Sequence, residues 1–69
     1  MTGTLTILDG TGHTDVAWDT AETATVEAAR EAFAEALLEG RLAVAGGKMV
    51  DEFDPRAGTI TVLPVMVGG

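Results

Sequence analysis

The chain has 69 residues, no cysteine and a formal net charge of −7, from 11 acidic and 4 basic side chains. This length allows one domain near the lower limit for independent folding, and a hydrophobic fraction of 46% is enough for a compact core. The lack of cysteine excludes disulfides and thiolate metal sites. The acidic balance argues against binding nucleic acid or an anionic membrane, and no apolar run is long enough to span a bilayer.

The first predicted elements are two strands joined as a hairpin. Residues 4–7 alternate polar and apolar side chains and include β-branched residues, which is typical of a half-buried strand. Residues 9–13 are rich in turn formers, and residues 14–18 are predicted to be the second strand. In that strand Val16 and Trp18 share one face, so we expect Trp18 in the core.

One helix is predicted for residues 25–39, with Thr25 as its N-cap and Gly40 as the residue past its end. Asp19 with Glu22 offers an alternative, earlier cap. The stretch is rich in alanine, a strong helix former. Its core-facing residues recur at helical spacing: Val26, Ala29, Phe33 and Leu37. We therefore expect Phe33 to be buried against a sheet.

The remaining elements are short strands separated by turns. Residues 42–44 and 48–50 are predicted strands on either side of a tight turn at Gly46-Gly47. Residues 54–58 contain a proline and form a second turn, and residues 59–62 are the last predicted strand. A single helix in this order must cover one face of a four- or five-stranded sheet.

This order predicts an α+β fold of the β-grasp (ubiquitin-like) type, with a mixed sheet and one helix packed on one face. The last strand is expected in the centre of the sheet, beside the first. We expect one domain over residues 1–67 and a C-terminal diglycine tail at Gly68 and Gly69. The face of the sheet opposite the helix then remains available to a partner.

The C-terminal segment carries the most specific signal in the sequence. A carboxylate that is to be adenylated must enter a narrow channel, and glycines without Cβ allow the closest backbone approach. We therefore expect Gly68 and Gly69 to form the reactive C-terminus, although a glycine pair can also be a slack chain end. The preceding apolar residues would be sticky in solvent, so we expect them to bind a partner: Leu63, Pro64, Val65, Met66 and Val67.

The chain resembles the small sulfur-carrier proteins of the ubiquitin-like superfamily in three segments, which are residues 25–29, residues 42–44 with 49–50, and residues 58–69. Those proteins are the small subunit of molybdopterin synthase and the sulfur carrier of thiamine biosynthesis. They often have two consecutive prolines near the end, whereas here Pro64 is followed by Val65. The resemblance implies a carrier or modifier that is not itself an enzyme, holds no cofactor and is activated by a separate adenylating enzyme. Its compartment would be the cytoplasm.

No set of residues in the sequence predicts catalysis or metal binding. His13 is the only histidine and falls in a predicted turn. Asp9, Asp15 and Asp19 are expected to be solvated turn carboxylates. The pair Gly10 and Gly12 lacks the third glycine and the following helix of a dinucleotide-binding loop.

The predicted helix carries glutamates four residues apart, at Glu27, Glu31, Glu35 and Glu39. They form an acidic stripe along one side of the helix, where neighbouring like charges repel. The stripe is either a solvated helix back or a surface for a basic partner.

A second function remains open from the sequence. Phe53-Asp54-Pro55 gives a weaker resemblance to short proteins encoded by phages or prophages, which assigns no activity. The alternative is a structural interaction module, such as a virion accessory or decoration protein, that docks through the apolar C-terminal segment. In either case the expected partner is a protein, an adenylating enzyme or a subunit of a larger assembly, and self-association is possible.

Overall fold

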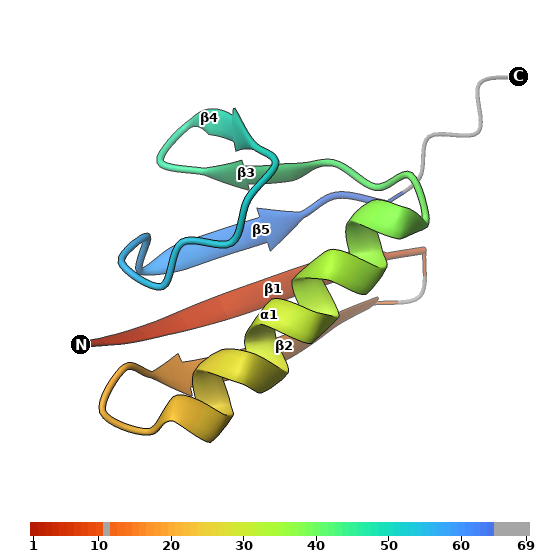
Figure 1. Ribbon diagram of the computed structural model, residues 1–69. Helices are drawn as coiled ribbons and strands as arrows, with labels where there is room; N and C mark the ends of the chain where they lie inside the picture. The colour runs from red at the N-terminus through yellow and green to blue at the C-terminus, as the bar shows by residue number, and fades with distance from the viewer. Residues whose placement is uncertain (11, 65–69) are drawn as a thin grey trace, which may run out of the picture.

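The computed structural model describes residues 1–10 and 12–64. Within these residues, one helix, α1 (Thr23–Leu38), packs on a five-stranded mixed sheet (Figure 1). The strands are β1 (Thr2–Asp9), β2 (Gly12–Asp19), β3 (Ala43–Ala45), β4 (Lys48–Val50) and β5 (Thr59–Val62). The α+β class and the single helix on one face are as predicted, and the arrangement is β-grasp-like.

The order of strands in the sheet is β2-β1-β5-β3-β4. Strand β5 is parallel to β1, with Leu5 opposite Ile60, and antiparallel to β3, with Ala43 opposite Val62. A parallel pair needs a long crossover connection, and here the chain passes through α1, β3 and β4 between the two strands. The prediction that the last strand lies in the sheet centre, beside the first, is confirmed.

The core lies between α1 and the sheet. Because side chains alternate across a strand, Leu5 of β1 shares the helix-facing side with Ile60 and Val62 of β5. Thr4 and Thr6 of β1 and Thr59 and Thr61 of β5 alternate with them and lie on the opposite face. The buried apolar residues are Leu5, Trp18, Ala29, Phe33, Ala36, Ala43, Ile60 and Val62. The predicted burial of Trp18 and Phe33 is therefore confirmed.

The helix begins earlier than the predicted Thr25 cap. Glu22 is the N-cap residue, and its side chain makes no capping hydrogen bond. The hydroxyl of Thr25 lies inside the first turn, where it accepts a 2.8 Å hydrogen bond from the Asp19 N–H and lies 2.7 Å from the Glu22 carbonyl oxygen. Thr25 thus ties the β2–α1 connection to the helix, because its hydroxyl bonds to the backbone that precedes the first turn.

The helix ends at Leu38, one residue before the predicted end, and Gly40 follows as expected. Gly40 has φ of 85°, a left-handed conformation that favours glycine. Its N–H donates to the Leu37 carbonyl at 3.0 Å, and the Arg41 N–H donates to the Ala36 carbonyl at 3.2 Å. These two bonds are a Schellman motif, which satisfies carbonyls that the helix end leaves unpaired.

The first hairpin is longer than predicted. The predicted turn over residues 9–13 is wrong in extent, because β1 continues to Asp9 and β2 begins at Gly12. His13 is therefore a strand residue, paired with Leu8. Backbone hydrogen bonds between antiparallel strands also form at polar residues. The polar composition of residues 9–13 therefore led to a predicted turn that is too long. Strand β3 is also displaced by one residue from the predicted 42–44.

Candidate functional site: interaction surfaces

The expected C-terminal partner segment is placed only at its start. The Leu63 N–H donates a 2.7 Å hydrogen bond to the Leu42 carbonyl oxygen, which extends the pairing beyond β5. Leu63 is half-buried and Pro64 is exposed. Val65, Met66, Val67, Gly68 and Gly69 lie outside the described residues. Their predicted roles stay predictions.

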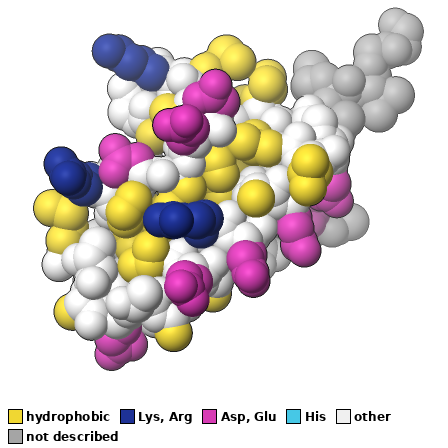
Figure 2. Space-filling view, viewed as in Figure 1, with side chains coloured by type: hydrophobic (Ala, Val, Ile, Leu, Met, Phe, Trp, Pro, Cys, Tyr) yellow, Lys and Arg dark blue, Asp and Glu magenta, His cyan; other side chains and the backbone are white. Residues whose placement is uncertain are grey.

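The acidic stripe lies on the solvent side of α1. All four of its glutamates are exposed: Glu27, Glu31, Glu35 and Glu39. Figure 2 shows acidic side chains in a row along the exposed side of the helix. The solvated position is as the spacing predicts, and whether a basic partner covers the stripe stays open.

Arg41 anchors the C-terminal end of the stripe. Its Nε lies 3.3 Å from Glu39 Oε1, without the alignment of a hydrogen bond. Its Nη1 donates to the Leu8 carbonyl oxygen at 3.0 Å. Arg41 thus ties the end of β1 to the segment after the helix, and it partly compensates the charge of Glu39.

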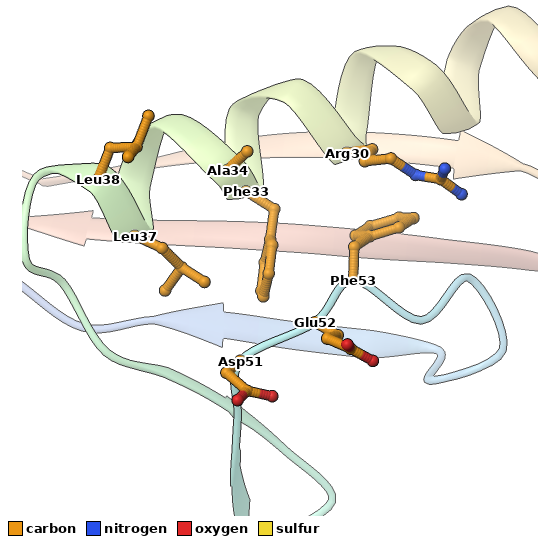
Figure 3. Close-up of a pocket in the computed structure, with 8 residues that line it drawn as sticks. All are labelled: Arg30, Phe33, Ala34, Leu37, Leu38, Asp51, Glu52 and Phe53. Carbon is orange, nitrogen blue, oxygen red and sulfur yellow. The ribbon is translucent and has the colours of Figure 1, made fainter.

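The structure adds a surface that sequence reasoning missed, which we call the helix groove. It is an open cavity of about 610 Å³ between the second half of α1 and the segment that follows β4 (Figure 3). Its lining residues are Arg30, Phe33, Ala34, Leu37, Leu38, Asp51, Glu52 and Phe53.

Phe53 forms part of the floor of the groove. Its ring centroid lies 5.0 Å from that of Trp18 and 5.9 Å from that of Phe33, both in edge-to-face geometry. The Arg30 guanidinium carbon lies 5.9 Å from the Phe53 ring centroid. Trp18 is held in turn by a 2.9 Å hydrogen bond from its Nε1 to the Pro55 carbonyl oxygen. The aromatic contacts therefore fix the loop against the helix.

The first hairpin brings some of the polar residues considered from the sequence into contact and keeps others apart. Thr6 Oγ1 donates to Asp15 Oδ1 at 2.9 Å, and His13 Nε2 lies 3.6 Å from Asp15 Oδ2. His13 and Asp15 are exposed. Asp9 and Asp19 lie at opposite ends of the first hairpin. In the part of the chain that the structure describes, no group of three or more potential ligand residues could hold a metal ion.

None of the helical segments in residues 1–10 and 12–64 has the length and apolar character needed to cross a membrane. Comparison of the chain with protein-family models, with curated protein sequences and with solved structures found no match.

Proposed function

We propose that this chain is a small ubiquitin-like carrier or modifier, activated at Gly69 by a separate adenylating enzyme. The observation that carries the proposal is the position of β5. This strand lies in the middle of the sheet, parallel to β1, and leads directly into the segment Leu63-Pro64 that precedes the diglycine. A domain whose central last strand leads toward a diglycine sequence suits delivery of a carboxylate to a partner's active site.

The proposed chemistry uses the α-carboxylate of Gly69, either encoded as the last residue or exposed by processing. A carboxylate oxygen attacks the α-phosphorus of ATP, the bond to the bridging oxygen breaks, and pyrophosphate leaves. The resulting acyl-adenylate is attacked at its carbonyl carbon by a sulfur nucleophile or an amine, and AMP leaves. The adenylating enzyme supplies the nucleotide site and the metal ion. This chain supplies only the carboxylate, which attacks ATP as a nucleophile and whose carbon becomes the electrophile once it is adenylated.

The alternative is a non-enzymatic structural module of a larger assembly, such as a virion accessory or decoration protein. Exposed apolar side chains at Leu38, Leu42 and Met49 favour an interaction role. Such residues cost little to keep exposed singly, and they contribute most when a partner covers them together. The carrier proposal implies the cytoplasm as the compartment, and the alternative implies the virion.

Reconstitution separates the two functions. The chain is incubated with ATP, a sulfide donor and an adenylating enzyme from the same organism, and its intact mass is measured. The carrier proposal expects an adenylate, or a thiocarboxylate heavier by the difference between sulfur and oxygen. The absence of any new mass, together with neighbouring capsid or tail genes and recovery of the chain in purified particles, would establish the alternative instead.

A further inference from the structure

We propose that the helix groove is a binding site for a basic amphipathic helix of a protein partner. The lining residues come from α1 and from the loop after β4, and the described residues of the C-terminal segment, Leu63 and Pro64, are not among them.

The floor of the groove is apolar and fixed in place. Figure 3 shows Phe33 and Leu37 projecting from α1 toward the opposite segment, with Phe53 facing them from that segment. Phe33 is only 3% exposed and packs edge-to-face on Phe53, so the floor is part of the core. A preformed apolar surface binds a partner without first losing conformational entropy.

The outer wall of the groove is apolar as well. Ala34 is exposed, and Leu38, four residues later on α1, is 88% exposed. Leu38 is the most exposed of the large apolar residues described. A partner that covers Leu38 removes apolar area from water without any change in the core, so Leu38 is suited to binding a partner.

Both margins of the groove are acidic. Asp51 and Glu52 are exposed on the side of the loop. On the helix side, Glu31 and Glu35 precede Ala34 and Leu38 by three residues, which makes them neighbours on the helix surface. Figure 2 shows acidic side chains on both sides of the hydrophobic area. The basic lining residue, Arg30, lies over the Phe53 ring.

The apolar floor and the acidic margins together indicate which kind of partner the groove would bind. A groove between a helix and a loop fits one face of a second helix, whose apolar residues recur at i, i+3, i+4 and i+7. Acidic margins favour Lys and Arg on the flanks of that helix. A second copy of this chain is a poor occupant, because each copy carries a net charge of −7 and would bring like charges together.

The test uses the full 69-residue chain and a fluorescein-labelled amphipathic peptide with leucines at helical spacing and lysines elsewhere. Fluorescence anisotropy measures its affinity at low and high salt. Two control peptides keep the leucine spacing with glutamates in place of lysines, or scramble the leucines and lysines. We expect saturable binding of the first peptide alone, with affinity falling as salt rises.

Matched variants locate the site. Leu38→Gln should weaken binding by about tenfold, the loss expected for an apolar anchor. Met49→Gln changes another exposed apolar residue that does not line the groove, and it should leave affinity within about twofold. Glu52→Gln should weaken binding about two- to fivefold at low salt, whereas Glu22→Gln at the far end of the helix should not.

Backbone NMR shifts in the labelled chain give an independent location, since the peptide should shift Leu37, Leu38 and Phe53 first. Equal binding of the acidic or scrambled peptide, or equal effects of Leu38→Gln and Met49→Gln, would overturn the proposal. Concentration-dependent dimerisation that Leu38→Gln abolishes would overturn it in favour of a second copy. None of these outcomes involves Gly69, so they leave the carrier proposal to its own test.

Discussion

The indole ring of Trp18 on β2 lies directly over Gly3, its register partner on β1. A Cβ atom at position 3 would overlap the six-membered part of that ring, and it would lie 2.8 Å from the Gly58 carbonyl oxygen. Trp18 is 2% exposed and hydrogen-bonded to Pro55, so it has no room to withdraw. Glycine at position 3 is therefore what allows tryptophan at position 18.

This relationship predicts that Gly3→Ala destabilises the domain. Overpacking a filled core costs about 1–3 kcal/mol, a large share of the stability of so small a chain. Gly10→Ala is the matched control, because a Cβ there meets no atom within 4 Å. Urea unfolding followed by circular dichroism measures both. Equal free energies of unfolding for the two variants would contradict the packing described for Trp18.

Phe53 joins the loop to the core, and Phe53→Leu removes its two edge-to-face contacts. Each such contact contributes about 0.5–1.5 kcal/mol, so the free energy of unfolding should fall by about 1–3 kcal/mol. Leu38→Ala, at an exposed position, should change it by less than about 0.5 kcal/mol. For comparison, Phe33→Ala should cost about 3–5 kcal/mol, because it empties the centre of the helix interface. A neutral Phe53→Leu would mean that the loop does not pack on Trp18 and Phe33.

The acidic stripe makes a prediction of opposite sign. Glu31→Gln relieves two repulsive neighbours, Glu27 and Glu35, and should stabilise the free chain by about 0.4–1 kcal/mol at low salt. Glu22→Gln is the matched control and should destabilise it slightly, since a negative charge at the helix start is favourable. Thermal unfolding at low and high salt checks both effects, which should shrink with screening. A destabilised Glu31→Gln would show that this glutamate has a favourable contact instead.

The fold follows largely from local patterns. The alternation of polar and apolar residues predicted which side chains of strands 4–7 and 59–62 face the helix. The helical spacing of Ala29, Phe33 and Leu37 predicted which side of the helix faces the sheet. The helix start was misplaced because Thr25 has the residue type of a cap, yet its hydroxyl bonds to the preceding connection.

The helix groove was missed for a different reason. Phe53 is half-buried against Trp18 and Phe33, which are distant in sequence, and the segment around it has no periodicity. The only signal was one aromatic residue between Glu52 and Asp54, both acidic. Contacts between residues distant in sequence depend on the tertiary structure, and a local sequence pattern holds no information about them.

The role of the terminus is tested most directly by adenylation. An adenylating enzyme from the same organism is assayed for ATP–pyrophosphate exchange with the intact chain, with a chain lacking Gly69 and with Gly68→Trp. All three should have the same circular dichroism spectrum, because the last residues of a domain contribute little packing. The carrier account predicts exchange with the intact chain alone. Deletion of Gly69 leaves the new terminal carboxylate one residue short of the enzyme's nucleotide site, and the tryptophan side chain of the Gly68→Trp variant is too large for the enzyme's narrow channel. Exchange that is absent for the intact chain, or unchanged in both variants, would contradict it.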